Sequence, residues 1–176
     1  MTAPRRPLDD LLLYRLSRLL SVAGSMVIRL CEGRFGITRR EWRLVAVLAS
    51  RGELSSSELA EHAQLDRART SKSVGSLVAK QLVSRVVRPG DRRQVRLALT
   101  ESGQALYEEL FPLVTQINGE LMGALGEDDA ARFDECLRRL HTRAERMVEE
   151  AVLPKADRGR RGAGGAASPQ KPRKPE

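Results

Sequence analysis

Apolar residues recur every three or four positions over residues 8–30, which is the spacing of one face of an α-helix. The repeating positions are Leu8, Leu12, Leu16, Leu19, Leu20, Val27 and Leu30. Gly33 and Gly36 follow this run, and glycine commonly ends helices. The pattern predicts one long amphipathic helix near the start of the chain.

A second helix is predicted from Thr38 to about Ser50. Thr38 lies three residues before Glu41, which is the spacing of a capping box. The apolar positions that follow are Trp42, Val45, Ala46, Leu48 and Ala49. Arg51 and Gly52 then break the pattern, so we expect the helix to end there.

A short helix, a tight turn and a basic helix are predicted between residues 54 and 80. Leu54 is expected in a strand, and the serines after it precede a short helix over residues 58–63. The segment 64–66 forms the turn, in which Asp66 is the N-cap of a helix over residues 67–80. This order is typical of a helix-turn-helix, whose second helix enters the DNA major groove.

The hydrophobic period then changes from helical to alternating. Apolar and polar residues alternate over residues 83–88 and 95–99, on either side of a turn sequence at 89–91. The pattern predicts a β-hairpin whose tip carries Arg92 and Arg93. A thin basic projection of this kind suits the minor groove of DNA.

Two further helices are predicted after the hairpin. Thr100 and Gly103 open a helix that continues to about Leu125, and a last apolar stripe covers residues 128–152. Residues 154–176 have no apolar pattern and are rich in Gly, Ala, Pro, Lys and Arg, so we expect them to be disordered. The fold class is therefore mainly α with a small β-hairpin wing.

The charge of the chain concentrates in two segments. The net charge is +8, of which residues 66–96 carry +7 and residues 154–176 carry +5, so the rest is mildly acidic. A local excess of Lys and Arg favours nucleic acid as the partner. The alternative is an ordinary solvated surface, which the joint presence of a basic helix and a basic hairpin disfavours. The candidate DNA-binding residues are Ser57, Arg67, Arg69, Thr70, Ser71, Lys72, Ser73, Ser76, Arg88, Asp91, Arg92 and Arg93.

Other classes of protein find little support. Cys31 and Cys136 are far apart, and His62 and His141 lack a partner at zinc-ligand spacing, so neither a disulfide framework nor a metal site is expected. The sequence has no recognisable set of catalytic residues, so we expect that the protein is not an enzyme and binds no cofactor. Without a long apolar run or a signal peptide, the expected compartment is the cytoplasm and no membrane partner is expected.

The hairpin region resembles the wing of the MarR (multiple antibiotic resistance regulator) family. Residues 86–103 contain an Asp-x-Arg tip, a strand that ends in Leu-Thr, and a Gly at the start of the next helix. Residues 37–42 resemble the start of the family's second helix, and residues 59–78 resemble its helix-turn-helix. The resemblance covers about residues 8–150 in the same order.

This resemblance implies a homodimeric winged helix-turn-helix with a helical dimerisation domain. Residues 1–37 would supply a dimerisation helix, 38–100 the DNA-binding domain, 101–153 further dimerisation helices and 154–176 a disordered basic tail. Arg93 matches the family arginine that reaches the minor groove, and Asp91 matches the acid that holds it. The implied partner is double-stranded DNA with a near-palindromic operator.

The resemblance also implies control by a small molecule. Many members are repressors released by small, often aromatic, anionic ligands, which here predicts an aromatic carboxylate effector held by Arg18, Arg39, Trp42 and Arg43. In the alternative interpretation, which involves no ligand, Trp42 is a core residue and these arginines are solvated surface residues. Two other hypotheses remain. One is redox sensing by Cys31 or Cys136, although we expect both to be buried structural thiols. The other is non-specific architectural binding of DNA. The sequence does not identify the effector or the operator, nor does it say whether DNA binding represses or activates transcription.

Overall fold

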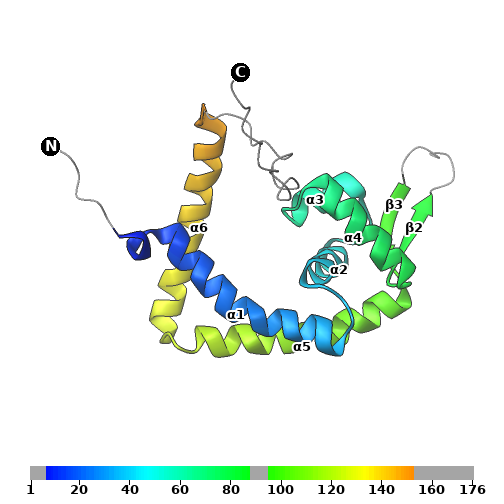
Figure 1. Cartoon of the computed structure of the whole chain (residues 1–176), viewed down its shortest axis with the longest axis horizontal. Coiled ribbons are helices and arrows are strands. Elements are labelled where there is room, and N and C mark those ends of the chain that lie inside the picture. The colour runs from blue at the N-terminus through cyan, green and yellow to red at the C-terminus, as the bar shows by residue number, and fades with distance from the viewer. Residues whose placement is uncertain (1–6, 88–94, 153–176) are drawn as a thin grey trace, which may run out of the picture. The chain divides into compact units, whose positions relative to one another are not determined.

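The chain forms a mainly helical fold with a small antiparallel sheet, as the sequence predicted (Figure 1). The structure is a computed structural model that describes residues 7–87 and 95–152. The described elements are η1 (Leu8–Asp10), α1 (Leu12–Arg34), α2 (Arg39–Arg51), β1 (Leu54–Ser55), α3 (Ser56–His62), α4 (Arg67–Ala79), β2 (Val83–Val87), β3 (Val95–Leu99), α5 (Glu101–Met122) and α6 (Glu127–Glu150).

Local sequence signals explain where several helices begin and end. Thr38 and Glu41 form the predicted capping box of α2, and Ser55 and Glu58 form a second one that starts α3 two residues before the predicted position. The amides of Phe35 and Ile37 both donate to the carbonyl of Cys31, which ends α1. Gly36 follows with a φ of 63°, a left-handed conformation that glycine adopts without strain.

The three strands form a sheet of order β1-β3-β2. Leu97 on β3 pairs with Leu54 on β1 and with Arg85 on β2. The side chains of Leu54, Val83 and Leu97 are buried, so one face of the sheet joins the core. The base of the hairpin is thereby fixed to the helices, as a wing requires.

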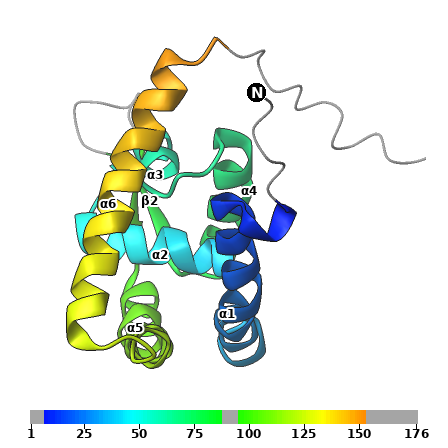
Figure 2. The ribbon, with the colours of Figure 1, turned by 90° about the vertical axis from the view of Figure 1, so that its left-hand side faces the viewer.

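The core lies between the second half of α1, helices α2, α3 and α4, the first half of α5 and the sheet. Its fully buried side chains include Leu44, Leu59, Leu77 and Leu110, which come from four different helices. Helix α2 lies across α1 and α5 and contacts both (Figure 2). Helices α3 and α4 both contact α2, which therefore joins them to the two long helices α1 and α5.

The start of α5 lies unusually close to the segment that precedes the sheet. A Cβ atom built on Gly103 would overlap the carbonyl oxygen of Leu82 and lie 3.0 Å from its carbonyl carbon. The Thr100 amide donates to that same oxygen, and the Thr100 hydroxyl donates to the carbonyl of Gln81 at 2.6 Å. Only glycine fits at position 103 while these contacts hold.

The chain divides into two compact units, residues 1–126 and 127–176. In the second unit α6 is a continuous helix with ion pairs along its surface, such as Arg138 with Glu135 at 2.6 Å. Large apolar side chains stay exposed on α1, α5 and α6, including Leu13, Val22, Phe111 and Val148. The finer division into four functional parts stays a prediction. Within the described residues, no helix is both long and apolar enough to span a membrane.

Candidate nucleic-acid interface

Helices α3 and α4 form the helix-turn-helix around a turn at residues 63–66. Gln64 adopts a φ of 51° in this turn, and the Leu65 amide donates to the carbonyl of Ala60. The Asp66 carboxylate accepts from the backbone amide of Arg69 at 2.8 Å, which makes Asp66 the predicted N-cap of α4. Both helices thus begin at a capped N-terminus.

The exposed face of α4 is basic and polar. Arg67, Arg69, Ser71 and Lys72 are exposed, and Ser57 is exposed at the start of α3. These side chains are therefore available to a DNA duplex. Arg88, Asp91, Arg92 and Arg93, the predicted wing contacts, lie outside the described residues.

The predicted exposure of three other α4 residues is wrong. Thr70 is fully buried and its hydroxyl donates to the Asp66 carbonyl at 3.0 Å, while Ser73 is 7% exposed. Ser76 is half-buried and hydrogen bonds to the Glu41 side chain. These positions share a helix face with Val74 and Leu77, so helical spacing alone could have placed them inside. We no longer assign them to DNA.

Arg96, which was not among the predicted site residues, joins the wing to α3. Its guanidinium donates to the Glu58 carboxylate at 2.8 Å and to the Glu53 carbonyl at 2.8 Å. Hydrogen bonds from the Ser55 amide and hydroxyl lower the pKa of Glu58, and the Arg96 charge lowers it further. The strand that leads from the wing is thereby tied to the start of the helix-turn-helix.

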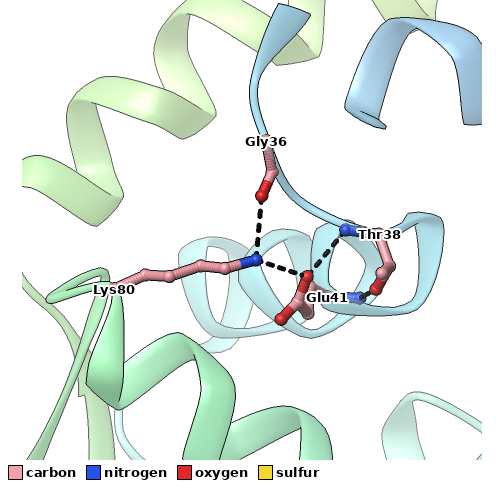
Figure 3. Close-up of polar contacts among 4 residues, drawn as sticks. All are labelled: Gly36, Thr38, Glu41 and Lys80. Atoms are coloured by element: carbon pink, nitrogen blue, oxygen red, sulfur yellow. Dashed lines mark hydrogen bonds and ion pairs between the residues drawn. The ribbon is translucent and has the colours of Figure 1, made fainter. Parts of the chain in front are cut away.

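A second polar cluster ties α4 to the junction of α1 and α2 (Figure 3). Lys80, the C-cap of α4, donates to the Gly36 carbonyl at 2.8 Å and to the Glu41 carboxylate at 3.0 Å. The same carboxylate accepts from the Thr38 amide at 2.6 Å. Because Glu41 is 3% exposed, these contacts are shielded from water and the pair is stronger than a surface ion pair.

The pKa of Glu41 depends on two opposing effects, its burial and its hydrogen bonds. Burial alone would raise the pKa, but hydrogen bonds from Ser76, the Thr38 backbone and Lys80, together with the Lys80 charge, bring it below its ordinary value of 4.5. The carboxylate is therefore ionised at neutral pH, and it stabilises the fold most where it stays ionised.

The four predicted effector residues have different surroundings. Trp42 is buried, and its ring stacks on Tyr107 at a centroid distance of 5.8 Å. Arg18 pairs with Asp9 at 3.1 Å on the surface, and Arg43 donates to the carbonyl of Ala63 at 3.3 Å. Arg18 and Arg43 thus have protein partners already.

Arg39 is the better-placed cation. Its guanidinium is half-buried against the backbone of Gly24 on α1, where a Cβ atom would lie 2.7 Å from Nη1. No carboxylate pairs with it among the described residues. Arg39 and Trp42 are three positions apart on α2, so their side chains leave the same helix face. Tyr107, which also lies near Phe111 at 5.1 Å, extends the aromatic surface.

The two cysteines differ from each other. Cys31 is fully buried as expected; burial and the Glu32 charge raise the pKa of its thiol, although the Arg39 charge opposes them. A protonated thiol reacts slowly with oxidants, which argues against Cys31 as a redox sensor. Cys136 is exposed within the single chain, so the prediction that both thiols are buried is wrong for Cys136.

The sheet-supported hairpin after a helix-turn-helix defines a winged helix-turn-helix protein, and comparison with known proteins agrees. Residues 35–94 match the model of the MarR family. The MarR family transcriptional regulator SPO1453 from Silicibacter pomeroyi DSS-3 is 30% identical, with a TM-score of 0.68 over 78% of this chain and 98% of that one. The chain belongs to the MarR family.

Two other similar proteins extend this comparison. The HTH-type transcriptional repressor NicR from Pseudomonas putida is 33% identical over 104 residues, which cover 59% of this chain and 66% of NicR. The chain therefore matches just under two thirds of the length of that curated relative. BpsR from Bordetella bronchiseptica, whose DNA binding is regulated by 6-hydroxynicotinic acid, is 22% identical and shares the fold, with a TM-score of 0.69 over 78% of this chain and 97% of that one.

Proposed function

We propose that the protein is a homodimeric, sequence-specific DNA-binding transcriptional regulator that represses its target genes. The observation that carries this proposal is the exposed face of α4, where Arg67, Arg69, Ser71 and Lys72 stand on a capped helix supported by the core. Side chains of these types bind phosphates and base edges. The family, and the repressor name of NicR, point the same way.

The apolar surface of the long helices supports the homodimer. Leu13 and Val22 on α1 are more than two-thirds exposed, and Phe111 on α5 and Val148 on α6 are exposed as well. Apolar area of this extent is normally covered by a partner. A two-fold dimer presents two α4 helices, so we expect a near-palindromic operator with half-sites about one helical turn apart. We further propose that Arg93, held by Asp91, reaches the minor groove.

Binding of DNA fragments tests the regulator against its alternative, an architectural protein. The full-length protein should bind its own promoter region about a thousandfold more tightly than random DNA at physiological salt. Fluorescence anisotropy with competitor DNA measures this ratio. Equal affinity for both fragments would establish the architectural protein instead.

We also propose that a small aromatic carboxylate releases the operator by binding beside Arg39 and Trp42. The Arg39 guanidinium, which pairs with no carboxylate among the described residues, supplies the cation, and the Trp42–Tyr107 stack supplies an aromatic wall. Arg18 and Arg43 would contribute after leaving their present partners. Because BpsR responds to 6-hydroxynicotinic acid, this compound belongs in the first panel of acids, beside benzoic and hydroxybenzoic acids.

Arg39→Ala should raise the acid concentration that releases half of the operator by about tenfold, because a charge-assisted hydrogen bond is lost. Arg40→Ala, at the exposed neighbouring position, should leave that concentration unchanged. Gly24→Ala should resemble Arg39→Ala, since its methyl group displaces the guanidinium. Titration of the operator complex with each acid gives the values. A normal response in both Arg39→Ala and Gly24→Ala would place the effector elsewhere.

A further inference from the structure

Asp66 binds Arg69 in two ways at once. One carboxylate oxygen accepts from the backbone amide of Arg69 at 2.8 Å and caps α4, while the other pairs with Nε of the same residue at 3.1 Å. The backbone and the guanidinium of Arg69 are thus held by a single carboxylate. The Asp66 side chain is 29% exposed and that of Arg69 is 54% exposed, so about half of the Arg69 side chain is open to solvent.

This pairing determines how Arg69 can bind a ligand. Because the ion pair with Asp66 is made through Nε, the terminal Nη1 and Nη2 groups remain available to a ligand. These two groups form a planar fork that matches the O6 and N7 acceptors of guanine. A surface ion pair of this kind adds little stability. Its effect is to restrict the rotamers of Arg69 before binding, which lowers the entropy lost on binding.

The neighbouring cations lack this restraint. Arg67 and Lys72 are exposed on the same helix, and neither has a carboxylate partner in the part of the chain that the structure describes. Their side chains can follow the position of a phosphate, which needs charge but no fixed orientation. The two types of surrounding point to a division of roles on α4.

On the basis of the proposed function, we infer that Arg69 determines sequence specificity by donating end-on to a guanine in each half-site, and that Asp66 positions it. Arg67 and Lys72 neutralise phosphates. Asp66 is a positioning residue, since its carboxylate binds Arg69 and leaves the base to the guanidinium. The operator must therefore contain a symmetry-related pair of guanines whose replacement weakens binding.

The test is a scan of single base-pair substitutions across the operator found in the promoter fragment, made with the full-length protein and its variants. For the wild type, replacing the guanine in one half-site should weaken binding about 5- to 150-fold. Arg69→Ala should bind the original and the substituted operators equally well. Arg69→Lys should also lose the preference but keep the salt dependence, because lysine retains the charge without the fork.

Two further variants distinguish the orientation of Arg69 from effects on folding and from the positive charge of α4. Asp66→Asn keeps an N-cap side chain, so the protein should fold normally but show a reduced guanine preference. Arg67→Ala should weaken binding to every operator variant by the same factor and reduce the slope of log affinity against log salt by about one. Circular dichroism and thermal melting of each variant confirm that the fold is intact.

The outcomes distinguish this inference from the proposed function. A wild type that binds all DNA equally would overturn the regulator itself, before any variant is needed. Selective wild-type binding with an unchanged guanine preference in Arg69→Ala would overturn the role of Arg69 alone. A full wild-type preference in folded Asp66→Asn would overturn the positioning role of Asp66.

Discussion

Gly103→Ala is expected to reduce the free energy of unfolding by about 3 kcal/mol, because its methyl group must displace backbone atoms. The added Cβ would overlap the Leu82 carbonyl oxygen, and the Leu99 side chain lies 3.3 Å away on another side. Moving the start of α5 away from Leu82 would stretch the hydrogen bond from the Thr100 amide to the Leu82 carbonyl. Thermal denaturation should show a fall in Tm on the order of 10 °C.

Gly75→Ala is the matched control for this substitution. Gly75 lies within α4, is exposed, and offers open space to an added methyl group, with no neighbouring atom within 4 Å of it. Alanine should stabilise the helix there by about 0.5–1 kcal/mol. If both variants melted like the wild type, the close approach of α5 to Leu82 would be wrong.

The close contact at Gly103 also links the wing to the long helix that leads away from it. Thr100 caps α5 through the Gly103 amide at 3.0 Å and contacts the segment before β2 through its own amide and hydroxyl. The turn from β3 into α5 is therefore held by three hydrogen bonds. These hydrogen bonds join the start of α5 to the segment that leads into β2.

Local sequence patterns predicted the helices and strands of this fold well. The capping box at Thr38, the glycine ends and the change of period at residue 83 are signals within a few residues, and the structure has the elements they indicate. Confirmation of the fold class also rests on the similar solved structures. The start of α3 differed by two residues from the prediction, because Ser55 is its N-cap.

The candidate site was predicted less well, because side-chain exposure depends on the elements packed above it. Thr70 and Ser73 are polar residues on the inner face of α4, and their chemistry suggested DNA while their spacing indicated burial. Arg96 contacts Glu58 across 38 positions, a pairing that no local pattern contains. Lys80 entered the sequence analysis only through the net charge of residues 66–96, whereas in the structure it binds Glu41 and Gly36.

The ion pair of Lys80 with Glu41 leads to the second large expected effect. Lys80→Met should lower the free energy of unfolding by about 2 kcal/mol at neutral pH, because it leaves a buried carboxylate without its charged partner. The Lys80 side chain is itself 36% exposed, which keeps the effect below that of a fully buried pair. Lys72→Met, at an exposed position of the same helix, is the control and should melt like the wild type.

The pH dependence distinguishes the loss of this ion pair from a simple packing defect. The pKa of Glu41 lies below its ordinary value of 4.5 in the folded wild type, so its ionised form stabilises the fold above about pH 4.5, and this contribution is lost as the pH falls through the lowered pKa. In Lys80→Met the hydrogen bond and the charge of Lys80, which both lower this pKa, are gone while burial remains, so the pKa of Glu41 should rise. The destabilisation should then shrink between about pH 6 and pH 3.

Chemical denaturation at several pH values measures this change. Glu41→Gln in the Lys80→Met background should recover part of the lost stability at pH 7, because the neutral amide is cheaper to bury than an unpaired carboxylate. A destabilisation of equal size at every pH would show that Lys80 acts through packing alone. Because the pair joins the end of α4 to the α1–α2 junction beside Arg39, its loss should also loosen α4 at its C-terminal end, opposite the end where Asp66 holds Arg69.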